Sequence, residues 1–264
     1  MTIPDVLDGA FAILKRRPRD VVLLAAAFVI PVQLIAAVLL RDVFEATGFA
    51  GTGFGDSSSV GVQDGGEVTG VGASVVAVLI STCSLALLTG ALARLVADWY
   101  QGIATPAGRV LVLTLRRAPA LLVGVVLVKI LEILGLVGVG IGAYVAMALL
   151  HVVSAVIVAE SVGPFRAVAR SMKLTSRRFW RSMGLPALVG LIGMLLSLGF
   201  QIIPEVLVLL VDDRWNWLVR AASSTVSELV VAPFTAGVVV LYHLDLRIRT
   251  EGYDIQLALE QRAR

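Results

Sequence analysis

Three ionisable side chains stand inside apolar runs of about twenty residues or more that hold few or no other charges: Lys129, Glu132 and Glu228. Runs of this length are typical of segments in a lipid bilayer, where a charge is costly and usually faces a partner or a water-filled path. Lys129 and Glu132 are three residues apart and would share a helix face, whereas Glu228 lies at a similar depth in another run. We expect Lys129 to pair with Glu132 or Glu228 in a candidate intramembrane polar site, which would either lock helices together or carry protons or ions.

Side chains suited to catalysis are few. The two histidines, His151 and His243, lie far apart in the sequence, and the single cysteine, Cys83, sits among small residues in an apolar stretch. HExxH, GxSxG, phosphate-loop and paired-cysteine patterns are absent from the sequence, and a hydrolytic metal site needs several histidine or carboxylate ligands. We therefore expect no catalytic residue, no metal and no cofactor, in a protein that is not an enzyme.

The composition defines the class of protein. Of the 264 residues, 58% are hydrophobic and 16% are charged, whereas a soluble domain has about 45–50% apolar and about 25% charged residues. This balance excludes an ordinary soluble globule, and it excludes disorder, which requires low hydrophobicity. One cysteine cannot form an intramolecular disulfide. A polytopic membrane protein remains.

Six runs are long and apolar enough to cross a membrane. They cover residues 21–40, 72–93, 118–136, 139–159, 184–203 and 218–243. We predict an all-α polytopic bundle of about six transmembrane helices, forming a single integral membrane domain over residues 1–264. Glycines between the third and fourth runs predict a tight helical hairpin, and residues 204–211 either extend the fifth helix or lie at the interface.

The first run could also be a signal peptide, because four basic residues precede it. A signal peptide core has only about 7–15 residues and ends at a small-residue cleavage site. The run here is longer and ends at Arg41 and Asp42, so we interpret it as a membrane span. Residues 41–71 then form a flexible outer loop rich in glycine and serine.

The distribution of basic residues predicts the orientation. Of the 22 lysines and arginines, 17 precede the first run, follow the sixth, or lie between the second and third or the fourth and fifth runs. Only Arg41 and Arg214 lie in the alternate connections, and the remaining three, Arg94, Lys129 and Arg220, lie within the runs or at their ends. Because lysine and arginine remain on the cytoplasmic side, we expect a multi-pass protein of the cell membrane with both termini in the cytoplasm.

Two amphipathic segments are expected outside the spans. Residues 2–14 begin with a helix cap at Thr2 and place apolar residues at helical spacing, so they form a short helix that lies on the cytoplasmic leaflet or packs against the bundle. A basic cytoplasmic helix is expected between the fourth and fifth spans. Its cations alternate with apolar residues, which indicates contact with anionic headgroups of the bilayer rather than with nucleic acid; they are Arg166, Arg170, Lys173, Arg177, Arg178 and Arg181.

Two stretches, 160–181 and 241–254, together resemble the glycerophosphoryl diester phosphodiesterase membrane-domain family, and in particular its stand-alone actinobacterial-type members. The N-terminal residues 6–11 fit the same family. The motif residues are Glu160, Gly163, Pro164, Arg170, Ser171, Leu174, Asp245, Arg247, Arg249, Glu251 and Gly252. In fused members of the family this module precedes a separate catalytic barrel domain; the chain ends about twenty residues after the sixth span, so the resemblance implies a membrane module without the barrel. The mixed charges of residues 245–251 are expected to pair in part with the basic helix.

Two classes of function remain open on the sequence. One is a non-catalytic membrane module that scaffolds, anchors or regulates partner proteins, including a membrane-protein partner. The alternative is a small transporter or lipid-handling protein. The first predicts that the intramembrane polar residues matter for stability alone, and the second predicts a cavity lined by Lys129, Glu132 and Glu228.

Overall fold

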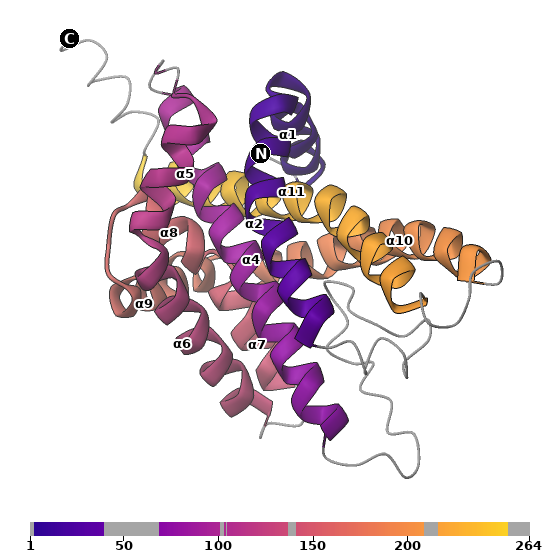
Figure 1. The fold of residues 1–264 in the computed structure, drawn as a ribbon. Helices are drawn as coiled ribbons and strands as arrows, with labels where there is room; N and C mark the ends of the chain where they lie inside the picture. Colours follow the sequence, from indigo (N-terminus) through magenta and orange to yellow (C-terminus); the bar gives the residue numbers. More distant parts are fainter. Residues whose placement is uncertain are drawn as a thin grey trace.

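The structure, a computed structural model, describes residues 3–39, 69–100, 103, 105–136, 141–208 and 216–252. Within these ranges the chain forms ten helices and no strand (Figure 1). The helices are α1 (Ile3–Arg16), α2 (Pro18–Leu39), α4 (Thr69–Tyr100), α5 (Ala107–Arg116), α6 (Ala118–Leu136), α7 (Ile141–Leu150), α8 (Val153–Ala159), α9 (Pro164–Ser176), α10 (Phe179–Val208) and α11 (Asn216–Glu251).

Six helical stretches are long and apolar enough to cross a membrane, which confirms the predicted polytopic all-α bundle. They are Pro18–Val38, Val78–Tyr100, Ala118–Leu136, Ile141–Ala159, Phe179–Phe200 and Ala221–Glu251. The predicted outer loop 41–71 lies outside the described residues, except that its last three residues, 69–71, already belong to α4. The backbone of α10 continues past Pro204 to Val208, so the apolar piece after this proline extends the fifth helix as far as the structure describes it.

The fourth span is not one continuous helix. It is divided into α7 and α8 by a turn at His151 and Val152. The backbone carbonyls in the last turn of a helix have no N–H donor within that helix, so they accept hydrogen bonds from groups outside it. The Leu149 carbonyl obtains two, because the hydroxyls of Ser171 and Thr175 on α9 donate to it at 2.7 and 3.0 Å. The break therefore lies where α9 packs against the span.

The third and fourth spans form the predicted hairpin, and glycine permits their close approach. A Cβ on Gly135 of α6 would lie 2.6 Å from the carbonyl carbon of Gly142 of α7. That distance is far inside van der Waals contact, so the two backbones can touch here only because neither residue has a side chain. The same glycines that the sequence places near the turn thus set the distance between the helices.

Helix α1 packs against the protein and not on a free lipid surface. Its apolar stripe, Val6, Ala10 and Ile13, is buried, and the Phe11 ring lies 4.8 Å from the ring of Phe234 on α11. A Cβ on Gly9 would lie 2.8 Å from a methyl carbon of Leu241, also on α11. Of the two interpretations open on the sequence, the packed helix is therefore correct for this face.

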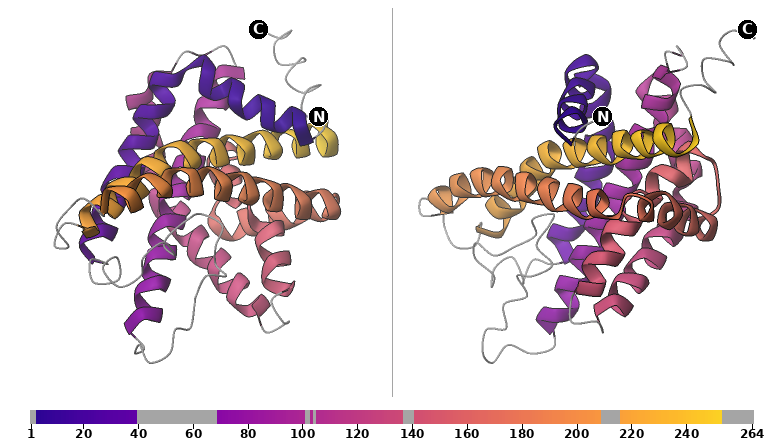
Figure 2. Two further views of the ribbon diagram at one scale, coloured as in Figure 1. Left: turned by 90° about the vertical axis from the view of Figure 1, so that its right-hand side faces the viewer. Right: turned by 180° about the vertical axis from the view of Figure 1, so that it is seen from behind.

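Helices α10 and α11 lie side by side and cross the other spans at a steep angle (Figure 2). Helix α11 is the central element, since 72% of its span is buried, against 17% for α6. It is helical to Glu251, eight residues beyond the predicted end of the sixth span at residue 243. The charges of its last two turns therefore lie on a helix. The helix continues beyond the apolar run because the residues that follow still favour a helix, although they are no longer apolar.

Candidate functional site

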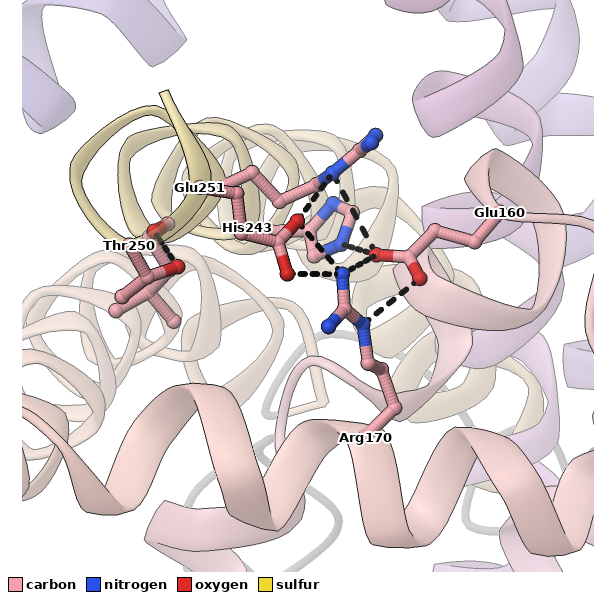
Figure 3. A network of polar contacts seen from close by, with 7 residues as sticks. Glu160, Arg170, His243, Thr250 and Glu251 are labelled. Carbon is pink, nitrogen blue, oxygen red and sulfur yellow. Dashed lines mark hydrogen bonds and ion pairs between the residues drawn. The ribbon is translucent and has the colours of Figure 1, made fainter. Parts of the chain in front are cut away.

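Most of the charged residues that carry the family resemblance meet where the C-terminal part of α11 passes α8 and α9 (Figure 3). Glu160 directly follows α8, Arg170 lies on α9, and His243, Arg247 and Glu251 lie on α11. We call these five residues the motif cluster. The tertiary fold assembles it, because 81 positions separate Arg170 from Glu251.

A sharp turn after α8 places Glu160 opposite Arg170. Ser161 has a positive φ of 55°, which a residue with a side chain rarely adopts. Pro164 then begins α9 at a position where its missing N–H costs nothing, and Gly163 caps the helix with extended backbone. Gly163 itself has an ordinary φ of −73°, and a Cβ there would meet nothing within 4 Å, so neither φ nor a nearby atom requires glycine at this position.

Arg170 joins two carboxylates from different helices. Its Nε and Nη2 donate to the two oxygens of Glu160 at 2.9 and 3.4 Å, and the same Nη2 donates to Glu251 at 2.7 Å. A paired contact of guanidinium with carboxylate is among the strongest hydrogen-bonding arrangements in proteins. Arg247 Nε lies 3.6 Å from an oxygen of each of the same two carboxylates, so charge is balanced within the motif cluster.

The electrostatics of Glu160 follow from these contacts. Burial by itself would raise the pKa of the Glu160 carboxyl, but hydrogen bonds and charge from His243 and Arg170 lower it to about 2. Burial by itself would lower the pKa of Arg170, but hydrogen bonds and charge from Glu160 and Glu251 raise it. Because an ionised carboxylate only accepts hydrogen bonds, the buried His243 presents a protonated Nε2 to Glu160, at 3.3 Å.

A second group of ion pairs lies along the same turns of α11, on the opposite side of the helix from the motif cluster. Asp245 binds Arg249 of its own helix at 2.9 Å and Arg181 of α10 at 3.2 Å. The Arg181 guanidinium also lies over the ring of Tyr242, 5.8 Å from its centroid. Together with the Arg170–Glu251 contact, this confirms that the mixed charges of residues 245–251 pair in part with the basic segment.

Hydroxyl groups complete the contact between α9, α10 and α11. The buried Ser182 hydroxyl donates to the Thr175 carbonyl at 3.1 Å and lies 2.8 Å from the Tyr242 hydroxyl. The Tyr242 ring stacks on His151 at the break of the fourth span, with centroids 5.2 Å apart. The motif residue Leu174 is fully buried beside these groups, and Gly252 ends α11 with a φ of 61°, a left-handed conformation that favours glycine.

The basic segment divides into two sets. Arg170 and Arg181 turn inward to the ion pairs described above, and the other four cations are exposed, namely Arg166, Lys173, Arg177 and Arg178. Large apolar side chains accompany the exposed set: Phe165 is 71% and Trp180 is 85% exposed. This outward surface of α9 and the start of α10, which we call the basic face, combines cations with aromatic rings as interfacial helices do.

The three predicted intramembrane residues do not form one site. Lys129 Nζ donates to Glu132 Oε2 at 2.8 Å, so of the two predicted partners Lys129 pairs with Glu132. Glu228 lies on α11 with only 6% of its surface exposed. Among the described residues its Oε1 has no hydrogen-bond partner, and no ion pair joins it to Lys129.

The sequence patterns did not indicate the contacts of two buried polar residues, His243 and Asp98. His243 lies in the motif cluster, but a lone histidine in an apolar run carries no local signal of its partner. Asp98, near the end of α4, is buried and binds Arg94 at 3.1 Å and the Thr105 hydroxyl at 2.8 Å. The spacing of Arg94 and Asp98, four residues apart, is a helix-pair signal that could have indicated this contact.

In the described part of the chain, no group of three or more His, Cys, Asp or Glu side chains is arranged to hold a metal ion. Comparison with known proteins adds no assignment: no family model, curated protein or solved structure matches the chain.

Proposed function

We propose that the chain is a non-catalytic multi-pass module of the bacterial cell membrane that anchors and scaffolds partner proteins. The observation that carries this proposal is the internal pairing of the motif cluster. Its two carboxylates and two arginines bind one another between α8, α9 and α11. Charges used in this way hold helices in place, which favours a structural platform over an active site.

We also propose membership of the glycerophosphoryl diester phosphodiesterase membrane-domain family. In its support, motif residues from both stretches of the chain meet in one network, with Arg170 binding Glu160 and Glu251 at once. A set of residues that only resembled a motif by chance would have no reason to lie together. The proposal takes from the family its membrane module alone and not the hydrolysis carried out by a separate domain.

In the proposed orientation both termini are cytoplasmic, and the basic face lies on anionic headgroups of the inner leaflet. Each exposed cation would contribute about 1 kcal/mol to this contact. The test uses the full chain in nanodiscs with a fluorophore on Ser176→Cys in a Cys83→Ser background. Phosphatidylglycerol should shift the emission to the blue relative to phosphatidylcholine, and salt should reverse the shift. Equal emission in both lipids would contradict the contact.

The scaffold itself is tested by photo-cross-linking in cells. A photoreactive amino acid is placed on outward surfaces at Leu134 of α6, Trp180 of the basic face and Leu195 of α10, all of them exposed. A scaffold should give at least one adduct of defined protein mass. The buried position Leu88 serves as the control and should give none. Lipid adducts alone at all three outward positions would contradict the scaffold.

A second function, a small transporter or lipid-handling protein, is favoured by one observation. Glu228 is a buried carboxyl whose Oε1 has no hydrogen-bond partner among the described residues, and such residues often mark proton or ion routes. Proton flux into proteoliposomes tests it directly. Flux that Glu228→Gln abolishes, with stability retained, would favour transport; the absence of flux in the unaltered protein would exclude a proton route.

A further inference from the structure

Two adjoining cavities lie between the C-terminal half of α1 and the C-terminal end of α4. The larger, of about 270 Å³, is lined mainly by Ile13, Arg16, Arg17, Leu95, Val96 and Trp99. The smaller, of about 140 Å³, shares Ile13, Arg16, Val96 and Trp99 and also has Asp5 in its lining. In the described part of the chain no acidic side chain lines the larger cavity, so it is the better place for an anion.

The larger cavity has a cationic mouth and apolar walls. The Arg16 guanidinium stacks on the Trp99 ring, with its central carbon 4.6 Å from the ring centroid. A stacked guanidinium keeps its in-plane N–H groups available for a further acceptor. Arg17 is held by Asp20 only at 3.5 Å and is 40% exposed. Behind these two cations the walls are the apolar side chains Ile13, Leu95 and Val96.

The position of the larger cavity along the spans fits the headgroup level of a bilayer. The first span begins at Pro18, directly after Arg17, and the second ends at Tyr100, directly after Trp99. The cations and the aromatic ring therefore stand at the same end of two antiparallel spans, where tryptophan and tyrosine are enriched in membrane proteins. In the orientation proposed above, on which this step rests, this end faces the cytoplasm, whose leaflet carries anionic lipids.

We propose that the larger cavity binds one anionic phospholipid. Its phosphate contacts Arg16 and Arg17, and the first part of an acyl chain lies along Ile13, Leu95 and Val96. Pockets that enclose a whole small ligand measure about 300–1,000 Å³, so a cavity of about 270 Å³ holds the phosphate, the glycerol and the start of one chain. The rest of the lipid remains in the bilayer, which the cavity reaches through the partly exposed Trp99 and Ile103.

The experiment uses Trp99 as the reporter in the full chain. Trp180, Trp215 and Trp217 are replaced by phenylalanine, and the protein is reconstituted in phosphatidylcholine vesicles. Two vesicle preparations contain the same minor fraction of a brominated lipid, which is phosphatidylglycerol in one and phosphatidylcholine in the other. The bromine lies in the upper part of the acyl chains. Bromine quenches tryptophan at contact, so the ratio of the two quenching efficiencies measures the preference of the cavity for the anionic lipid.

Brominated phosphatidylglycerol should quench Trp99 several-fold more than brominated phosphatidylcholine. Arg16→Gln and Arg17→Gln should each reduce this preference about fivefold, the equivalent of about 1 kcal/mol per cation. Arg19→Gln is the matched control, because Arg19 is exposed and close in sequence but does not line the cavity. It should leave the preference unchanged, and Arg16→Lys should retain most of it.

Two results would overturn the proposal. Equal quenching by the two brominated lipids in the unaltered protein would show that the cavity does not select an anionic lipid. A loss with Arg19→Gln equal to that with Arg17→Gln would show that the general surface charge, and not this cavity, attracts the lipid. Arg17 lies outside the Arg16–Trp99 stack, so its variant tests the site even where Arg16→Gln destabilises the protein.

Discussion

One carboxylate, Glu160, contacts the largest number of partners in the motif cluster. Glu160 binds Arg170, lies 3.3 Å from His243 and 3.6 Å from Arg247, and thereby joins the end of α8 to α9 and α11. Removing one partner of such a partly buried pair leaves the other charge uncompensated and typically costs about 3–5 kcal/mol, although the intact network contributes far less than that to stability. The value of Glu160 is therefore in specifying which helices meet.

Glu160 should make the stability of the protein depend on acid. Its pKa is lowered from the ordinary 4.5 to about 2 in the folded protein, so the stabilisation it contributes is present above about pH 4.5 and is lost as the pH falls towards 2. Its loss corresponds to a decrease on the order of 3 kcal/mol in the free energy of unfolding. Thermal unfolding in detergent between neutral pH and pH 2 measures this decrease.

Glu160→Gln should remove this part of the acid dependence and lower the stability at neutral pH. Asp8→Asn, which changes an exposed carboxylate on α1, serves as the control and should unfold with the same pH profile as the unaltered protein. Parallel profiles for Glu160→Gln and the unaltered protein would contradict the role of Glu160.

The partner of Lys129 can be identified by a double-mutant cycle. Because Lys129 contacts Glu132 at 2.8 Å, Lys129→Met and Glu132→Gln should be non-additive by about 0.5–3 kcal/mol in the free energy of unfolding. Lys129→Met and Glu228→Gln should be additive, since no contact joins those two residues in the described part of the chain. Thermal stability in nanodiscs provides both cycles, and coupling of Lys129 to Glu228 in place of Glu132 would overturn the assignment.

Among the elements, the α6–α7 hairpin depends most directly on individual residues. Gly135→Ala would place a Cβ 2.6 Å from the backbone of Gly142, so the helices must separate, at a cost of about 1–3 kcal/mol. Gly184→Ala is the matched control within α10, because a Cβ there meets nothing within 4 Å. It should be neutral or stabilising by up to about 1 kcal/mol, since alanine has the higher helix propensity. Chemical or thermal unfolding should rank Gly135→Ala well below Gly184→Ala.

Helix α11 has two roles at once. Its first part is a buried apolar span against α2, α4 and α10. In its last turns Asp245 binds Arg181 of α10, Glu251 binds Arg170 of α9, and Arg247 lies beside Glu160. Its 36 residues extend about 54 Å at 1.5 Å per residue, well beyond a hydrocarbon core of about 30 Å. A helix of this length can therefore have its apolar part in the bilayer while its charged end remains close to the headgroups.

For the molecule as a whole, the orientation is open to direct labelling. In a Cys83→Ser background, Ser58→Cys should react with a membrane-impermeant maleimide added outside intact cells, because residues 41–71 are expected to lie outside. Ser176→Cys on the basic face should react only after the membrane is permeabilised. The physical reason is that 17 of the 22 basic residues lie in the connections expected on the cytoplasmic side, where lysine and arginine are retained. The opposite labelling pattern would reverse the orientation and with it the proposed lipid contacts.

The sequence by itself determined the properties that depend on neighbouring residues. Hydropathy over about twenty residues located all six spans, since a helix that crosses lipid must be apolar along its own length. Glu132 was one of the two partners predicted for Lys129, because the two residues lie within a single turn of one helix. The apolar stripe of α1 was likewise predicted from apolar residues at helical spacing, although this spacing does not indicate whether lipid or protein covers the stripe.

Only the tertiary structure decided which distant groups meet. Arg170 and Glu251 are 81 positions apart, and their contact depends on the sharp turn at Ser161 that folds α9 back beside α11. The sequence likewise gave no means of excluding Glu228 as the partner of Lys129, or of choosing between lipid and α11 as the cover of α1. In each case the local pattern specifies a charge or an apolar face, whereas its partner depends on how whole helices pack, and helix packing is settled by the shape and volume of many side chains at once.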